Sequence, residues 1–180
     1  MNRFIIFFLL ISAYSNCQKI SQEKWILSSE QSYISYEGKH ILHEWSGKSK
    51  NVKGILIMEN NQPVKTAIIS AIKDFDSGNS SRDSHAMEIL ETLLFPDVSF
   101  FGDAFIIKDE IFTVNGKIKF HSIEKNIDAS GSWKKTNKKI TLKGSFKLKP
   151  SDFEIDLPDF MLVKMENNLD IEYELIFLQG

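Results

Sequence analysis

Apolar and polar residues alternate along much of the second half of the chain, which is the pattern of a β-strand with one buried face. The clearest run begins at Ile111, where apolar side chains share one face and Thr, Asn and Lys share the other. The apolar face consists of Phe112, Val114, Ile118 and Phe120, and the polar face consists of Thr113, Asn115, Lys117 and Lys119. The alternation predicts a half-buried strand here.

The same period of two recurs in three more segments, which are 127–133, 140–149 and 169–177. Four earlier segments alternate less regularly, and they are 32–40, 54–59, 64–72 and 98–107, the last with a break near Gly102-Asp103. A short polar connection at 135–138 favours antiparallel pairing of its neighbours. We therefore predict an all-β fold, an antiparallel barrel of about eight strands.

One segment has a helical period instead. Its apolar residues at spacings of three and four are Met87, Leu90 and Leu94. Because Pro96 ends the run, we expect a single helix around 82–94. Ser80 is the expected N-cap, with Asp83 at the third helical position as in a capping box. The apolar stripe of this helix is expected to pack on the mouth or the wall of the barrel.

Several glycines occupy positions on the apolar faces of the predicted strands. They are Gly38, Gly116, Gly131 and Gly144. A glycine inside a strand weakens the strand and therefore needs a reason. Two explanations stay open. The glycines allow the sharp bends by which a barrel turns its corners, or their missing side chains leave a lumen that an apolar ligand fills.

The chain has 180 residues, 42% of them hydrophobic, which suits one domain with a substantial core. At the N-terminus Arg3 precedes an apolar run at 5–11 that is too short to span a bilayer, as in a secretory signal peptide. Small residues favour cleavage after Cys17, giving a signal peptide over 1–17 and a domain over 18–180. The alternative is lipidation of Cys17, which would anchor the protein as a lipoprotein.

Charge and cysteine content narrow the classes of function. Loss of 1–17 removes Arg3 and leaves 21 basic against 24 acidic residues, a net charge of −3. This balance gives no reason to expect a nucleic-acid partner. Because Cys17 is the only cysteine, the mature chain would have no disulfide, thiol nucleophile or cysteine metal ligand.

The residues that catalysis or metal binding would need do not occur in a recognisable arrangement. The chain lacks a Gly-x-Ser-x-Gly elbow. His40 and His43 are three apart, which on one extended strand would send them to opposite faces. His121 follows the inward-facing Phe120 among polar neighbours. We expect neither a metal site nor enzymatic activity.

Three ionisable residues cluster where the predicted helix begins. Arg82 lies in the first turn, where a cation meets the positive end of the helix dipole and needs an anion nearby. Asp83, another carboxylate or a ligand head group could supply that anion. His85 lies three residues after Arg82 and shares roughly its face, so the two can present donors to one acceptor. A hydrogen-bonded structural role for His85 is the alternative.

Four blocks of the sequence occur in an order and spacing that match a known family. They are FDSGNSSRDSHAMEIL at 75–90, FPDVSF at 95–100, VNGKIKFH at 114–121 and FKLKPSDFEI at 146–155. On these blocks the chain resembles the YceI-like polyisoprenoid-binding family of exported bacterial proteins, over nearly its whole mature length. It departs from the family pattern at Ala86, which separates His85 from Met87, and at Ser122-Ile123.

The resemblance implies a lipocalin-like barrel whose apolar interior holds the tail of an isoprenoid quinone or polyprenyl lipid, with no other cofactor. The polar head would lie near the mouth, with Arg82, Asp83 and His85 as candidate contacts. Strand parity suggests the tail contacts, which are Phe112, Val114, Ile118, Ile140, Leu142, Phe146, Ile171 and Tyr173. Replacing Gly144 with Leu is expected to reduce lipid occupancy and to leave the fold intact.

The resemblance also implies an exported protein of the periplasm or cell envelope, in transient contact with membranes unless Cys17 is lipidated. A homodimer is an open alternative. Two other classes of function stay open as well. One is an interaction or stress protein with a filled barrel and no ligand, and the other is an enzyme that acts on a lipid head group through Arg82 and His85.

Overall fold

The computed structural model describes residues 22–40, 43–157, 159–160 and 163–180. The strands are β1 (Gln22–Leu27), β2 (Tyr33–His40), β3 (His43–Ser49), β4 (Val52–Glu59), β5 (Gln62–Ala71), β6 (Asp97–Lys108), β7 (Ile111–Phe120), β8 (Ile123–Lys135), β9 (Lys139–Leu148), β10 (Asp159–Phe160), β11 (Val163–Lys164) and β12 (Leu169–Gln179). The helices are α1 (Ser80–Ile89) and three short 3-10 helices, Ser29–Gln31, Ile72–Asp74 and Pro150–Phe153.

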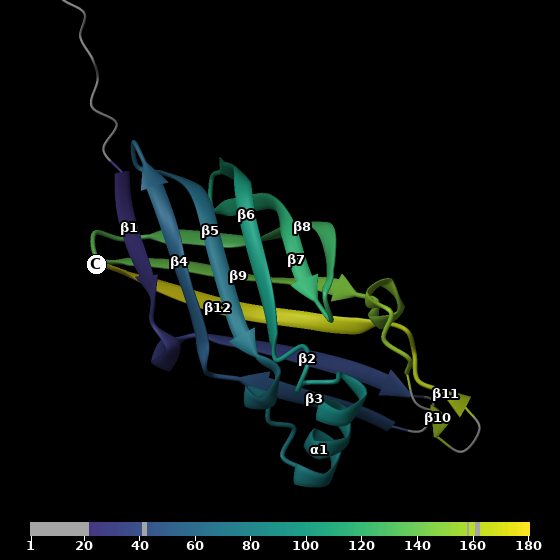
Figure 1. Ribbon diagram of the computed structural model, residues 1–180. Helices are drawn as coiled ribbons and strands as arrows, with labels where there is room; N and C mark the ends of the chain where they lie inside the picture. The colour runs from purple at the N-terminus through teal and green to yellow at the C-terminus, as the bar shows by residue number, and fades with distance from the viewer. Residues whose placement is uncertain (1–21, 41–42, 158, 161–162) are drawn as a thin grey trace, which may run out of the picture.

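Eight strands close into an antiparallel barrel in the order β1-β4-β5-β6-β7-β8-β9-β12 (Figure 1). The ring closes because β1 pairs with the end of β12, where Leu27 lies opposite Phe177. The rest of the same β12 edge pairs with β2, which in turn pairs with β3. The predicted all-β antiparallel barrel of about eight strands with one helix is confirmed.

The structure adds strands that the alternation did not predict. Strand β1 comes before β2, which is the first predicted strand. Strand β3 comes directly after β2 and forms a hairpin with it. This hairpin pairs the backbone of His40 with that of His43 across two strands. The parity argument for two histidines on one extended strand therefore does not apply to this pair, because His40 and His43 belong to two antiparallel strands.

A β-bulge divides β6 into two halves. The register between β6 and β7 shifts between Gly102 and Ala104, where the break in the alternation was predicted. One extra residue reverses which side chains face inward. Phe100 packs against the core before the bulge, and Phe105 and Ile107 do so after it. Because of the bulge, both halves of this long strand direct apolar side chains into the barrel interior.

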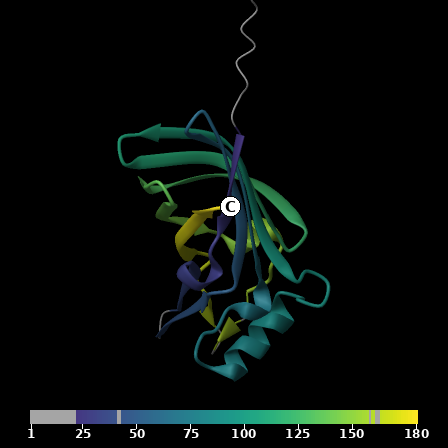
Figure 2. The same cartoon turned by 90° about the vertical axis from the view of Figure 1, so that its left-hand side faces the viewer.

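The barrel interior holds two apolar clusters. One cluster includes Trp25, Phe112 and Phe177, each no more than 1% exposed. The other lies nearer α1 and includes Ile118, Phe120 and Phe153, the last from the 3-10 helix after β9. Figures 1 and 2 show α1 at one end of the barrel, away from the end where β1 begins. Among the described residues, α1 is the only helix longer than one turn, and it covers this end of the barrel.

Helix α1 begins and ends earlier than predicted. Its N-cap is Asn79, whose side-chain oxygen accepts the backbone N–H groups of Ser81 and Arg82 at 3.1 Å, so the prediction of Ser80 is wrong. Asp83 still stabilises this end, because its carboxylate accepts the backbone N–H of Ser77 at 3.2 Å. None of the described helices is long and apolar enough to cross a bilayer.

The predicted C-terminal extension of the helix to residue 94 is also wrong. Glu91 has a φ of 45°, a left-handed conformation that ends a helix. The chain then turns, and the backbone N–H of Leu94 donates to the Glu91 carbonyl at 2.8 Å. Leu93 is 100% exposed and Leu94 is 69% exposed. The predicted apolar stripe therefore stops at Leu90, and these two leucines do not pack on the barrel.

Candidate ligand-binding cavity

The barrel encloses a cavity of about 490 Å³ that is lined mainly by apolar side chains. Strands β2, β3, β5, β6, β7, β8, β9 and β12 contribute to its wall, together with α1. Near α1 the lining includes the exposed side chains of Lys73, Arg82 and His85, so the cavity opens to solvent at this end. A volume of this size is typical of sites that bury a small apolar molecule. The cavity also disfavours the alternative of a completely filled barrel.

Seven of the eight residues suggested as tail contacts line this cavity. They are Phe112, Val114, Ile118, Leu142, Phe146, Ile171 and Tyr173. Ile140 does not, because it is 0% exposed within the core beside Phe177, near the closed end of the barrel. Strand parity identifies the inward face of a strand but not how far along the strand the cavity extends.

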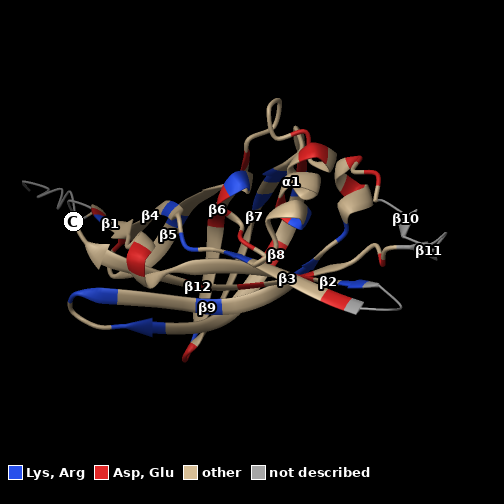
Figure 3. Cartoon of the chain, turned by 90° about the horizontal axis from the view of Figure 1, so that it is seen from below, with Lys and Arg blue, Asp and Glu red and all other residues tan. Residues whose placement is uncertain are grey.

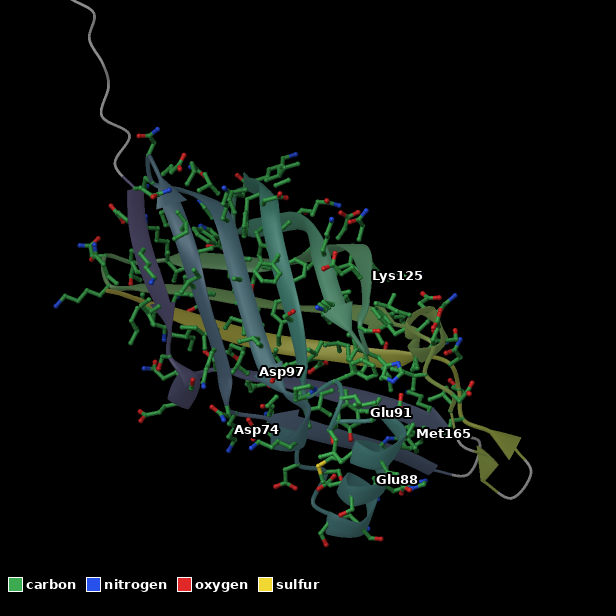
Figure 4. All side chains as sticks on the ribbon, in the orientation of Figure 1. Asp74, Glu88, Glu91, Asp97, Lys125 and Met165 are labelled. Carbon is green, nitrogen blue, oxygen red and sulfur yellow. The ribbon has the colours of Figure 1, made fainter. Side chains whose placement is uncertain are left out.

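Other lining residues come from segments whose alternation is weaker. Ile68 and Ser70 project inward from β5, and Phe100 does so from β6 before the bulge. The period of two in 64–72 could have identified Ile68 as inward-facing. Met165, by contrast, lies in a connection where no sequence pattern pointed to the cavity, and Figure 4 places it at the same end of the barrel as Glu88 and Glu91.

The polar cluster at the start of α1 lies at the opening of the cavity. Arg82 and Asp83 both belong to the lining, and among the described residues the Arg82 side chain has no hydrogen-bond or salt-bridge partner. The Nδ1 atom of His85 lies 3.8 Å from a carboxylate oxygen of Glu88, and the His85 side chain is 62% exposed. Figure 3 shows both signs of charge on α1. Arg82 is thus a cation available to a molecule in the opening.

Tyr36 is a polar residue at the opening that the sequence did not reveal. Burial raises the pKa of Tyr36, the nearby Asp83 carboxylate raises it further, and the Arg82 guanidinium opposes this. The phenol therefore stays neutral and can both donate and accept a hydrogen bond. Its ring packs 6.0 Å from that of Phe75 and lies over Gly47. Tyr36 and Arg82 come from β2 and α1, so only the fold brings them together.

Tyr173 is the main polar residue deep in the cavity. Its hydroxyl donates to the backbone carbonyl of Ser130 at 3.1 Å, and the residue is only 7% exposed. Burial raises the pKa of this phenol well above its ordinary value. Among the described residues, every buried side-chain nitrogen or oxygen has a hydrogen-bond partner. The deep wall therefore offers a ligand no unsatisfied polar group.

The raised pKa of Tyr173 predicts a loss of stability in alkali. An unfolded tyrosine ionises near pH 10, whereas the folded protein holds this proton to a higher pH. The folded state thus binds more protons, so stability is complete below about pH 10 and falls as the pH rises through the folded-state pKa. We expect urea unfolding of Tyr173→Phe to be less sensitive to pH above 10, at a cost of about 1 kcal/mol at pH 7 from the lost hydrogen bond. Identical slopes above pH 10 would contradict this assignment.

The inward glycines lie where other atoms approach closely. A Cβ at Gly131 would lie 2.1 Å from the Lys143 carbonyl oxygen, and one at Gly144 would lie 2.2 Å from the Ser130 carbonyl oxygen. The Tyr173 ring also covers Gly144. These glycines therefore permit close strand approach, and they do not themselves leave the lumen empty. The close backbone contact at Gly144 argues against the expectation that Gly144→Leu leaves the fold intact, because the new side chain would meet the Ser130 carbonyl oxygen.

His121 joins three segments near the open end without lining the cavity. Its Nε2 atom lies 2.9 Å from a carboxylate oxygen of Glu91, and its Nδ1 atom lies 3.0 Å from the Phe153 carbonyl oxygen. Phe95 packs edge-on against its ring at 4.6 Å. The His121 side chain is 12% exposed. This histidine ties the turn after α1 to the β7–β8 turn and to the 3-10 helix after β9.

No group of three or more His, Cys, Asp or Glu side chains within the described ranges is arranged to hold a metal ion. The site instead combines an apolar cavity with a polar opening. Such a cavity can bury a long apolar chain while a polar group at its end contacts Tyr36 and Arg82.

Comparison with known proteins gives a family match and several similar folds. A family model described as the YceI-like domain matches residues 25–177. BcnA of Burkholderia cenocepacia has a TM-score of 0.75 at 13% identity, covering 83% of this chain and 98% of its own. A polyisoprenoid-binding domain from Saccharophagus degradans has a TM-score of 0.71 at 10% identity, covering 87% and 98%. A YceI protein of Campylobacter jejuni has a TM-score of 0.62 at 21% identity, covering 76% and 87%. No curated protein sequence matches the chain.

Proposed function

The chain belongs to the YceI-like family, and from this premise we propose that it binds a long isoprenoid lipid, such as an isoprenoid quinone, in its barrel cavity. The solved domain from Saccharophagus degradans, which has a similar fold, is named as polyisoprenoid-binding. The observation that carries the proposal is the cavity of about 490 Å³, with an apolar wall and an opening beside α1. A ligand that fits this site has an apolar tail and a polar end.

The orientation of the bound lipid, tail inward or head inward, follows from where the polar groups of the cavity lie. The deep part of the wall includes Phe112, Val114 and Leu142, and the described polar atoms buried around it already have partners. A polar head placed there would lose its hydrogen bonds to water without replacement, which is costly. The tail therefore enters first, and the head stays near Tyr36 and Arg82.

Arg82 is the proposed donor to the head group, and Asp83 holds the start of α1 in place. A guanidinium can donate to a quinone carbonyl or to another head-group oxygen. His85 reaches the lining one turn further along α1 and can add a second donor. In this proposal Arg82 and His85 bind the ligand and do not catalyse a reaction.

We also propose that the protein is exported from the cytoplasm. The basic and apolar start of the chain supports a signal peptide over 1–17, which lies outside the described residues. An apolar lipid that is stored or carried in the cell envelope would suit an exported protein. Lipidation of Cys17 is the alternative, and the mass of the mature protein distinguishes the two.

Native mass spectrometry of the mature protein, purified gently from its own host, tests the proposal. We expect a protein mass increased by one lipid, and organic extraction should release an isoprenoid that can be identified. A bare protein mass, together with failure to take up an added isoprenoid quinone from detergent, would refute the proposed function. Cleavage after Cys17 would give a polypeptide that begins at Gln18.

The role of Arg82 predicts a head-group-specific loss of affinity. We expect Arg82→Gln to bind an isoprenoid quinone about fivefold more weakly, because one charge-assisted hydrogen bond at an exposed site contributes roughly 1 kcal/mol. Binding of squalene, an isoprenoid hydrocarbon without a polar head, should not change. Fluorescence titration can measure both, with Lys119→Gln on the outer face of β7 as a control for lost charge. An equal loss for both ligands would contradict the assignment.

A further inference from the structure

The turn formed by residues 90–95 presents two leucines to solvent at the open end of the barrel. Leu93 is 100% exposed and Leu94 is 69% exposed, although both are large apolar side chains. The segments on both sides of the turn belong to the cavity. Met87 lines it from α1 and Val98 lines it from β6, and Leu90, the first residue of the turn, lines it as well. The leucine turn is therefore continuous with the rim of the opening.

Backbone hydrogen bonds and side-chain contacts hold this turn in a defined shape. The backbone N–H of Thr92 donates to the Met87 carbonyl at 3.1 Å, and those of Leu94 and Phe95 donate to the Glu91 carbonyl at 2.8 and 2.9 Å. His121 then braces both ends of the turn, through its contact with the Glu91 carboxylate at 2.9 Å and the packing of Phe95 on its ring. The leucines are thus held outward by a braced turn.

The backbone of the brace is itself unusual. Glu91 has a φ of 45° and His121 a φ of 47°, in the left-handed region that residues with a Cβ seldom adopt. Such conformations persist only where surrounding contacts compensate their cost. In this protein the contacts that do so are those that fix the turn. Two adjacent leucines fixed outward beside the cavity opening form a small apolar contact surface, which a partner of apolar chemistry can cover.

The chemistry of the proposed ligand indicates which surface this is. A long isoprenoid is stored in bilayers, since its apolar tail is barely soluble in water. Two leucines beside the opening can insert a short distance into the boundary between head groups and acyl chains, as interfacial anchors do. Exposed carboxylates flank the turn at Glu88 and Asp97 (Figure 4). The cations Lys73 and Arg82 belong to the opening, but no Lys or Arg occurs between residues 83 and 107, so the turn and its flanks carry acidic charge. This charge would repel an anionic surface and favours a membrane of zwitterionic lipid.

We propose that the leucine turn is the contact by which the open end of the barrel rests on a neutral phospholipid surface while a lipid passes between the bilayer and the cavity. This inference rests on the proposed function. It concerns the route of the ligand and not the equilibrium of binding. The leucines lie outside the cavity lining, so removing them should slow transfer and leave the bound state unchanged.

The test compares transfer of an isoprenoid quinone from phosphatidylcholine vesicles with uptake of the same quinone from detergent. We expect the double variant Leu93→Ser/Leu94→Ser to take the quinone from vesicles at least roughly tenfold more slowly, since insertion of a leucine side chain contributes on the order of a factor of ten. Its occupancy after equilibration in detergent should equal that of the unmodified protein. Addition of anionic phosphatidylglycerol to the vesicles should slow transfer to the unmodified protein.

Ile106→Ser/Ile111→Ser is the matched control. These two aliphatic side chains are 68% and 61% exposed, and they lie at the β6–β7 hairpin, at the far end of both strands from the opening. We expect this variant to transfer lipid at the normal rate. Because Leu93 is fully exposed, Leu93→Glu provides a single variant that keeps the fold and should slow transfer as well.

Normal transfer by both leucine variants would overturn the inference that the leucine turn is the membrane contact. An equal slowing by the isoleucine control would overturn it as well. Faster transfer from anionic vesicles would also overturn it, because it would indicate an electrostatic contact elsewhere. Failure of the unmodified protein to take up quinone even from detergent would refute the proposed function itself. Slow transfer with full occupancy from detergent, in the leucine variants alone, supports the leucine turn as the membrane contact.

Discussion

Ala129→Phe is expected to abolish most lipid binding and to leave the barrel folded. Ala129 lies on β8, is 6% exposed, and its side chain already faces the cavity. A phenyl ring at this position would occupy space that the lipid tail needs. If it displaces about four methylene groups, each worth ~0.8 kcal/mol, the affinity falls by roughly a hundredfold or more. The measurement is a titration with an isoprenoid quinone, with circular dichroism to follow the fold.

Ser132→Phe is the control for Ala129→Phe. Ser132 lies on the same strand with its side chain exposed on the opposite face, so the added ring cannot reach the cavity. We expect the control to bind lipid normally. Unchanged affinity in Ala129→Phe would mean that the tail does not occupy the cavity, and the proposed function would lose its main support.

Gly144→Leu is expected to have the opposite effect, with loss of stability before any effect on binding can be measured. A Cβ at Gly144 would lie 2.2 Å from the Ser130 carbonyl oxygen and 2.6 Å from the Tyr173 hydroxyl oxygen. The carbonyl belongs to the backbone of β8 and cannot swing away as a side chain can. We expect a destabilisation of about 3 kcal/mol, the upper part of the range for overpacking, and a fall in Tm of roughly 10 °C.

Ser145→Leu controls for the added side chain, because Ser145 follows Gly144 on β9 and is exposed. Its Tm should stay close to that of the unmodified protein. A Gly144→Leu variant with normal Tm and reduced lipid occupancy would instead support the explanation that this glycine leaves room for the ligand. Calorimetry of the two variants distinguishes these explanations.

The pattern of side chains along the strands predicts much of the cavity wall. In β7 the two-residue period alone predicts that Phe112, Val114 and Ile118 face inward, and all three line the cavity. Ile140 has the correct parity as well, yet it lies beyond the deep end of the cavity. Parity is a local property of a strand. The extent of a cavity depends on how all the strands twist around it.

The opening of the cavity was only partly predictable. A cation in the first turn of a helix is unusual, which made Arg82 a candidate, and Arg82 lies in the lining. Tyr36 could not be found in this way, because it is one aromatic residue in an ordinary strand. It meets Arg82 and Asp83 only after β2 and α1 are brought to the same end of the barrel.

The alternation of apolar and polar residues is enough to specify the fold class, the approximate number of strands and their inward faces, because those follow from the two-residue period of extended backbone. It also specifies where β6 breaks, since an extra residue disturbs the period. Long-range contacts set the remaining features, which are the pairing of β1 with β12 that closes the barrel, the end of the helix at Ile89, and the exposure of Leu93 and Leu94. Such contacts join residues far apart in the chain, as His121 and Glu91 are joined, and no local pattern encodes them.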